Sequence, residues 1–155
     1  MKTLVLGLGN SILSDDGVGI KVAHEVANQL NNPQVTVVET SAAGLSLLDS
    51  IVGYDKVIII DAIQTEKGEA GQIYRMRTAD FSLTKHFSSP HQINLVTALE
   101  LGKMLNLAMP EEITVFAVEA KDITTFNENC TPEVEKAIPE AVRMVLAELK
   151  CQTSS

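Results

Sequence analysis

The chain has 155 residues, of which 45% are hydrophobic and 21% are charged, a composition typical of one folded globular domain. Twelve basic residues against 20 acidic ones give a formal net charge of −8, which argues against binding to nucleic-acid phosphates or to anionic membranes. Aromatic residues are only 4% and tryptophan is absent, unlike proteins that stack single-stranded bases on aromatic rings.

The sequence shows no features of membrane insertion or secretion. No apolar run approaches the roughly 18 residues of a membrane span, and the N-terminus lacks the apolar core of a signal peptide. Two cysteines, Cys130 and Cys151, cannot build a disulfide framework. We therefore expect a cytoplasmic protein with reduced thiols, folded as a single domain over residues 1–155.

The first 61 residues alternate between apolar strand patterns and helical patterns. Short β-branched or leucine-rich runs predict buried strands, and apolar residues repeated every three to four positions predict helices. The predicted elements are a strand in TLVLGLGN from residue 3, a helix from Asp15 to about Leu30, a strand at Val35–Glu39, a short helix over 42–50 and a strand at Lys56–Asp61.

The alternation changes at the fourth strand, which lies in GQIYRMR at residues 71–77. Only QTEKGEAG, residues 64–71, separates it from the third strand. A crossover helix between parallel strands needs at least about 10–12 residues. The fourth strand is therefore predicted to run antiparallel to the third.

The remaining elements complete an α/β pattern. Pro90 is predicted to begin a helix that ends near Leu105, Glu112–Glu119 is the fifth strand, and Thr131-Pro132 is predicted to begin a helix ending near Lys150. This order favours a three-layer α/β/α sandwich around a twisted, five-stranded, mostly parallel sheet with one antiparallel strand.

Ligands of such sheets bind where the strands end at their carboxyl edge. Asp15 and Asp16 follow the first strand, Asp61 ends the third, and His91 begins a helix after a long loop. Two carboxylates and an imidazole suit Zn²⁺, Ni²⁺, Mn²⁺ or Fe²⁺. Each residue also has a purely structural interpretation, since the paired acids could complement a helix N-terminus and Asp61 or His91 could stabilise a turn.

Two other functions fit parts of this pattern. The glycines at 7 and 9 suggest a dinucleotide site with Glu39 on a ribose, but Ile12 replaces the third glycine and the acidic pair would repel a pyrophosphate. A receiver-like phosphoacceptor module would use the acidic pair, Asp61 as acceptor and Lys121. Its acids would directly follow the first strand, however, whereas several residues intervene here.

Three motifs in this order resemble one known family. GLGNSILSDDGVG at 7–19, VIIIDA at 57–62 and SPHQINL at 89–95 are similar to motifs of the [NiFe]-hydrogenase maturation endopeptidases, and the likeness extends from Met1 to about Leu149. The resemblance implies the same five-stranded fold. It also implies that Asp16, Asp61 and His91 bind a metal ion, because family members have metal ligands at these positions.

The resemblance further implies a function. Family members remove a short C-terminal peptide from the nickel-loaded precursor of the hydrogenase large subunit, so this precursor is the expected partner. The expected metal is the nickel of that substrate, although Zn²⁺ or Cd²⁺ could occupy the same ligands. Asp16 and Asp61 would then be catalytic, as in an aspartic-type endopeptidase, and Asp15 would be the nearest base if a metal-bound water attacks.

Overall fold

The computed structural model describes residues 1–41, 45–77 and 90–150, and the side chains at 45 and 90–96 lie outside that description. The strands are β1 (Thr3–Leu8), β2 (Val35–Thr40), β3 (Lys56–Ile63), β4 (Ile73–Arg77) and β5 (Glu112–Glu119). The helices are α1 (Val18–Gln29), α2 (Leu45–Ile51), α3 (Pro90–Met104) and α4 (Pro132–Lys150), and a 3₁₀ turn, η1 (Ser14–Gly17), precedes α1.

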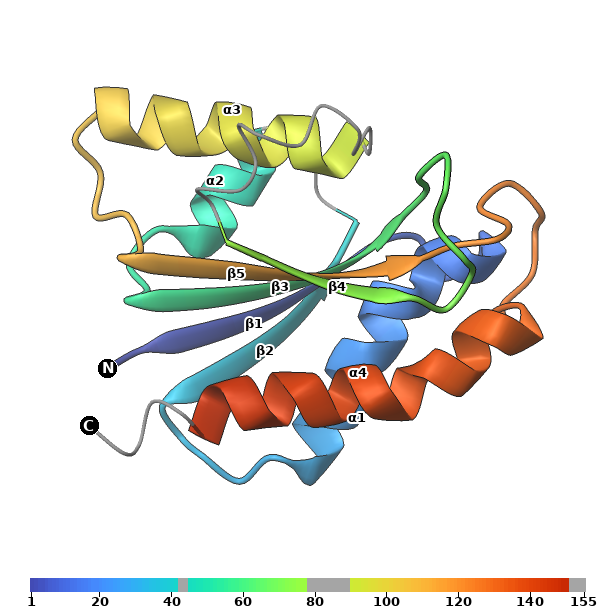
Figure 1. The fold of residues 1–155 in the computed structure, drawn as a ribbon. Coiled ribbons are helices and arrows are strands. Elements are labelled where there is room, and N and C mark those ends of the chain that lie inside the picture. The colour runs from blue at the N-terminus through green and yellow to red at the C-terminus, as the bar shows by residue number, and fades with distance from the viewer. Residues whose placement is uncertain (42–44, 78–89, 151–155) are drawn as a thin grey trace.

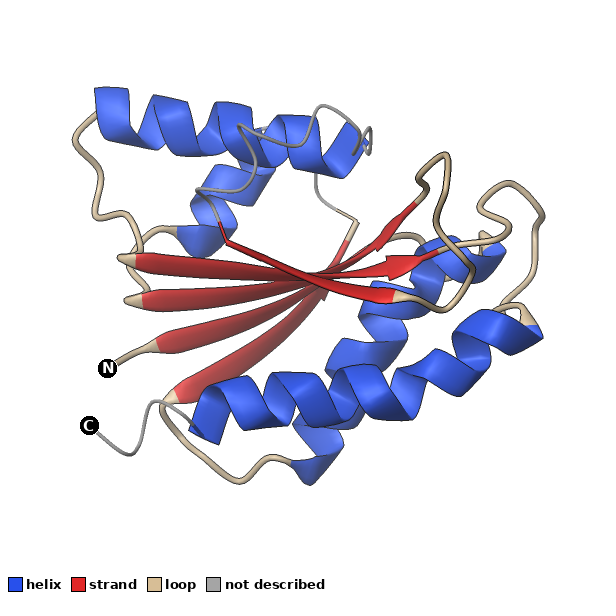
Figure 2. Cartoon of the chain, in the orientation of Figure 1, coloured by secondary structure: helices blue, strands red, loops and turns tan. Residues whose placement is uncertain are grey.

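The strands form one twisted sheet between two layers of helices. Helices α2 and α3 cover one face of the sheet, and α1 and α4 cover the other (Figures 1 and 2). The strand order is β2-β1-β3-β5-β4, and all neighbouring pairs are parallel except β4 with β5. The predicted three-layer α/β/α sandwich with one antiparallel strand is confirmed.

The antiparallel strand lies at an edge of the sheet. Strand β4 pairs with β5 rather than with β3, with Tyr74 opposite Ala117 and Met76 opposite Val115. The short connection after β3 therefore passes the end of β5 and returns along its outer side. Its predicted direction is correct, because so short a segment can reverse the chain but cannot hold a crossover helix.

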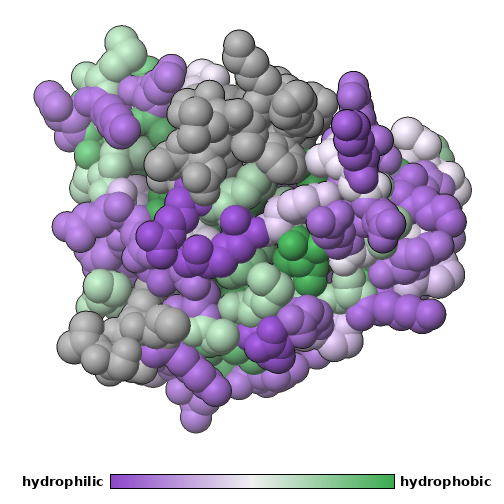
Figure 3. All heavy atoms as spheres, in the orientation of Figure 1, coloured by the Kyte–Doolittle hydropathy of each residue, from purple (hydrophilic) through white to green (hydrophobic). Residues whose placement is uncertain are grey.

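The core has two apolar layers, one on each face of the sheet. All residues of β1 and β3 are buried, and their side chains alternate between the two layers. In β3, Ile58 and Ile60 pack with α1 and α4, whereas Val57 and Ile59 pack with α2 and α3. Hydrophilic side chains cover much of the face seen in Figure 3, where apolar side chains form small separate patches.

Helix α1 begins later than the sequence indicated. Gly17 is its N-cap residue, and no acidic residue lies in its first turn. Asp15 and Asp16 instead belong to η1, which Ser14 enters with a φ of 52°. The expectation that both acids lie in the first turn of this helix is therefore wrong, and their roles have to be found in other contacts.

A buried ion pair joins α4 to the amino-terminal edge of the sheet. Lys56 is only 4% exposed, and its ammonium lies 3.6 Å from Glu148 Oε1. Arg75 donates a hydrogen bond of 2.8 Å to the same oxygen. Burial raises the pKa of the Glu148 carboxyl, but the hydrogen bond from Arg75 and the nearby positive charges outweigh burial and leave the pKa below its usual value.

Candidate active site

The strand order creates a topological switch point at the carboxyl ends of β1 and β3. The chain leaves β1 toward β2 on one side, whereas β3 lies on the other side of β1. Ligands of open α/β sheets bind at such a topological switch point, because the loops that follow the two strands diverge there. The loop carrying Asp16 follows β1, and Asp61 lies near the end of β3.

Asp16 is held by the loop that follows β1. The backbone N–H of Asn10 donates to Asp16 Oδ2 at 3.0 Å and to the Asp16 carbonyl oxygen at 3.3 Å. Gly9 makes this turn possible, since its φ is +146° and a Cβ atom there would lie 2.0 Å from the Asp16 carbonyl oxygen. The Asp16 side chain is partly exposed, so its carboxylate can be reached from solvent.

Asp61 lies within β3, two residues before the strand ends, and is 2% exposed. Its Oδ1 accepts a hydrogen bond of 2.8 Å from the N–H of Ala62. Because side chains alternate along a strand, Asp61 shares the face of Ile59 and Ile63, which pack in the layer of α2 and α3. The carboxylate therefore lies on the side of the sheet that α3 covers.

His91 is the second residue of α3, the helix on the face that Asp61 shares. Its backbone is thus on the same side of the sheet as the Asp61 carboxylate, but its side chain lies outside the described residues. Among the side chains that the structure does describe, no three His, Cys, Asp or Glu residues form a metal-binding group. The predicted ligand set Asp16, Asp61 and His91 remains a prediction.

Asp15 faces into the protein and away from the surface. It is fully buried, and its carboxylate accepts hydrogen bonds from the N–H groups of Lys121, Asp122 and Thr131 at 2.7–3.0 Å. The Thr131 hydroxyl also donates to it, at 2.8 Å to Oδ2. The adjacent acids therefore differ sharply, since Asp15 ties η1 to the β5–α4 loop whereas Asp16 reaches the surface.

Comparisons with known proteins decide the family. A family model described as hydrogenase maturation protease matches residues 20–148. The hydrogenase 2 maturation protease of Escherichia coli (strain K12) is 30% identical over 152 residues, which cover 97% of this chain and 92% of that protein. This chain belongs to the hydrogenase maturation protease family. The matched residues include Asp61 and His91, and Asp16 lies just before them.

Solved structures agree with this assignment. The hydrogenase maturating endopeptidase HybD from E. coli superimposes with a TM-score of 0.86 at 29% identity, covering 98% of this chain and 94% of that one. The [NiFe] hydrogenase maturation protease HybD from Thermococcus kodakarensis gives a TM-score of 0.76 at 26% identity, covering 95% and 98%. Likeness over nearly the whole length of these maturation proteases supports endopeptidase chemistry.

The receiver-like interpretation is not favoured. A receiver uses its lysine beside the acceptor aspartate, but the Lys121 ammonium lies 3.1 Å from a carboxylate oxygen of Glu133. The acidic pair is also divided, because Asp15 is committed to backbone donors. A phosphoacceptor must be open to solvent, whereas Asp61 is 2% exposed.

The sequence analysis did not identify Glu119, which is a further buried acid. It ends β5 and is 2% exposed. Its carboxylate accepts bonds from the Thr65 N–H at 2.8 Å, the Thr65 hydroxyl at 2.6 Å and the Tyr74 hydroxyl at 3.0 Å. Glu119 thus holds the β3–β4 loop against the carboxyl edge. A glutamate at the end of a strand gives no local signal of this role.

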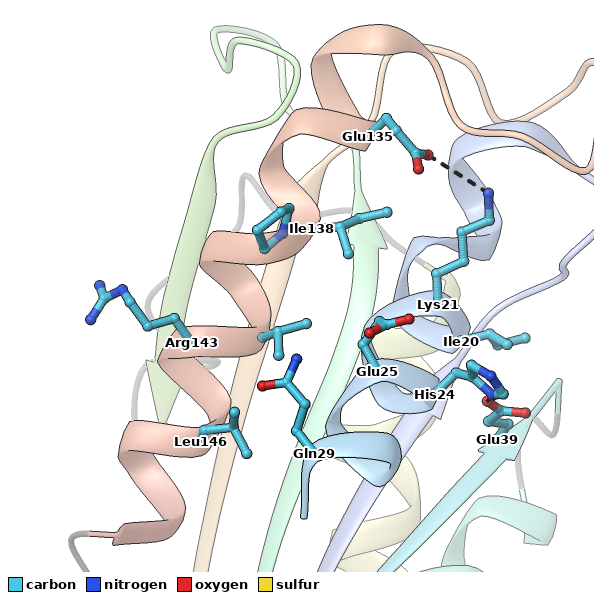
Figure 4. Close-up of a pocket in the computed structure, with 12 residues that line it drawn as sticks. Ile20, Lys21, His24, Glu25, Gln29, Glu39, Glu135, Ile138, Arg143 and Leu146 are labelled. Atoms are coloured by element: carbon cyan, nitrogen blue, oxygen red, sulfur yellow. Dashed lines mark ion pairs between the residues drawn. The ribbon is translucent and has the colours of Figure 1, made fainter.

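A large cavity lies between α1 and α4, away from the β1/β3 switch point. It has a volume of about 690 Å³, and Ile138 and Leu146 of α4 are among its apolar lining. Figure 4 shows Lys21 paired with Glu135 across it. The cavity lies on the sheet face opposite to that of Asp61, so we do not assign it to the same site.

None of the described helices is long and apolar enough to span a membrane.

Proposed function

We propose that this chain is a cytoplasmic endopeptidase that removes the C-terminal extension of a nickel-loaded [NiFe]-hydrogenase large-subunit precursor. The observation that carries the proposal is the position of Asp16 and Asp61 at the β1/β3 switch point in a chain of the hydrogenase maturation protease family. In this proposal Asp16, Asp61 and His91 bind the nickel of the substrate and thereby recognise a precursor that has received its metal.

The chemistry of these residues suits that task. Carboxylate and imidazole groups bind Ni²⁺, and also Zn²⁺ or Cd²⁺, so these ions can serve as probes. The Asn10 N–H fixes one oxygen of Asp16, leaving the other oxygen for the ion. Three protein ligands leave room in the metal's coordination shell for groups of the precursor.

We assign different tasks to the two neighbouring acids. Asp16 and Asp61 are the candidate catalytic carboxylates, because both lie at the β1/β3 switch point. Asp15 is a positioning residue in this scheme, since both of its oxygens already accept hydrogen bonds and it is fully buried. A general base needs access to the proton that it removes, which the contacts of Asp15 do not offer.

Mass spectrometry of precursor incubated with the purified protein tests the proposal. We expect wild type to shorten nickel-loaded precursor and to leave nickel-free precursor intact. Replacement of Asp16 or Asp61 by Asn, or of His91 by Ala, should abolish cleavage and weaken binding of Ni²⁺ or Cd²⁺ in calorimetry. Asp49→Asn, which changes an exposed acid of α2, is the matched control and should cleave like wild type.

Two results would contradict different parts of the proposal. Cleavage of nickel-free precursor at the wild-type rate would remove nickel recognition but leave the endopeptidase activity. Failure of wild type to cut either precursor would remove the substrate assignment. If the His91→Ala variant binds Ni²⁺ as tightly as wild type, His91 is not a ligand.

A further inference from the structure

Two loops are joined by backbone hydrogen bonds beside Asp16. The Asn127 N–H donates to the Ile12 carbonyl at 2.9 Å, and the Ser14 N–H donates to the Asn127 carbonyl at 2.8 Å. Leu13 and Asn127 form a parallel β-bridge. We call these joined segments, residues 10–13 and 122–129, the double loop. In Figure 1 the orange segment after β5 and the blue turn before α1 lie side by side.

Buried and local hydrogen bonds give the double loop a defined shape. Asp15 anchors the second segment through the Lys121 and Asp122 N–H groups. Asp122 Oδ1 then accepts bonds from the N–H groups of Thr124 and Thr125, both at 3.0 Å. Asn10 connects the first segment directly to Asp16. The surface of the double loop is therefore placed in a fixed position relative to the candidate site.

Each segment exposes one large apolar side chain. Ile12 is 48% exposed and Phe126 is 80% exposed. Within the described residues, the other large apolar side chains with comparable exposure are at the opposite end of the strands, at Met1 and at residues 104, 105 and 107. Single exposed apolar residues are common, but two on loops bonded to each other beside a candidate site indicate a binding surface.

We propose that the double loop binds the precursor chain next to the bond that is cut, with Ile12 and Phe126 contacting an apolar side chain of the substrate. This inference rests on the proposed function. The occupant is argued from continuity with the site, because the four-residue step from Ile12 to Asp16 spans at most about 14 Å and Phe126 precedes Asn127, which is bonded to Ile12. An extended peptide of a few residues bound at Asp16 is therefore long enough to reach the double loop.

Steady-state cleavage of nickel-loaded precursor tests the inference. We expect Phe126→Ser and Ile12→Ser each to raise KM by about tenfold, the usual order for losing one apolar anchor, and to leave kcat within about twofold of wild type. Phe126→Leu should recover most of the lost affinity. The matched control is Leu105→Ser, which removes a 58% exposed apolar side chain at the opposite edge and should leave KM unchanged.

The outcomes separate this inference from the proposed function. If wild type cleaves and both serine variants keep the wild-type KM, the double loop does not bind substrate, and the proposed function stands. A fall in kcat at constant KM would also overturn the inference. If wild type cleaves no precursor, the proposed function fails and the inference fails with it.

A second measurement does not depend on the variants folding correctly. Synthetic peptides spanning the cut should inhibit the wild-type enzyme, and replacing their apolar residue by serine should weaken inhibition about tenfold. Equal inhibition by both peptides would overturn the inference. The thermal melt of Phe126→Ser should match wild type, because this side chain is 80% exposed.

Discussion

Removing the Asp15 carboxylate should destabilise the protein far more than removing that of its neighbour. Asp15 accepts hydrogen bonds from four donors, which are the N–H groups of Lys121, Asp122 and Thr131 and the Thr131 hydroxyl. Asp16 accepts through its side chain from the N–H of Asn10 and is partly exposed. Comparing the stability of Asp15→Ala with that of Asp16→Ala therefore compares the loss of a buried, hydrogen-bonded carboxylate with the loss of a partly exposed one.

The magnitude follows from the number of donors left without a partner. A hydrogen bond to a charged group contributes about 1.5–3 kcal/mol, and a buried donor without a partner is costly. Water can reach the donors nearest the surface, so we count two of the four as lost. The free energy of unfolding should then fall by about 3–6 kcal/mol for Asp15→Ala and by less than about 1 kcal/mol for Asp16→Ala.

Urea denaturation followed by circular dichroism measures this difference. With an m-value of about 2 kcal/mol per molar urea, Asp15→Ala should lower the midpoint by about 1.5–3 M. Thr131→Val and Thr131→Ser form a matched pair. The valine variant removes the hydroxyl donor and should cost about 1–2 kcal/mol, whereas the serine variant keeps the donor and should recover most of that loss.

One result would refute this reasoning. If Asp15→Ala and Asp16→Ala lower the midpoint equally and by little, the Asp15 carboxylate does not hold the β5–α4 loop. The two acids would then contribute alike. If Asp15→Ala instead keeps wild-type stability and loses cleavage alone, Asp15 acts in the reaction and its assignment as a positioning residue is wrong.

Three further predictions concern other parts of the fold. Glu148→Gln should lower the free energy of unfolding by about 2–3 kcal/mol at pH 7, because Lys56 stays buried without this carboxylate. The pKa of Glu148 is lowered in the folded state, so its contribution is complete above the unfolded pKa and is lost as the pH falls through the folded pKa. Thermal melts of the variant and of wild type should therefore converge in acid. Burial raises the pKa of the Cys130 thiol from 9.0 to about 11, so iodoacetamide at pH 8 should alkylate it about 100-fold more slowly in the folded than in the unfolded protein, as read by peptide mass spectrometry. Gly19→Ala should lower the free energy of unfolding in urea by about 3 kcal/mol, because the new Cβ would lie 2.3 Å from the Ile60 carbonyl oxygen and would push α1 off the sheet. An unchanged urea midpoint would contradict that close packing.

Local sequence patterns determined most of the fold. The β-branched run of β3 and the apolar run of β5 predict strands because such residues pack on both faces of a sheet. The short segment after β3 set the direction of β4, since its length allows only a reversal. The alternation of strands and helices predicted where the carboxyl ends of the strands meet, and Asp16 and Asp61 are found in that region.

The tertiary structure decided what the individual acids do. Asp15 and Asp16 are identical neighbours in the sequence, but in a 3₁₀ turn successive side chains point about 120° apart. One therefore enters the protein and the other reaches its surface. The donors that bind Asp15 lie 106–116 residues further along the chain, and those of Glu119 lie on the β3–β4 loop and on β4. Contacts across such separations leave no local periodicity, so only the packing of the loops distinguishes an acid that joins two loops inside the protein from one that reaches the surface.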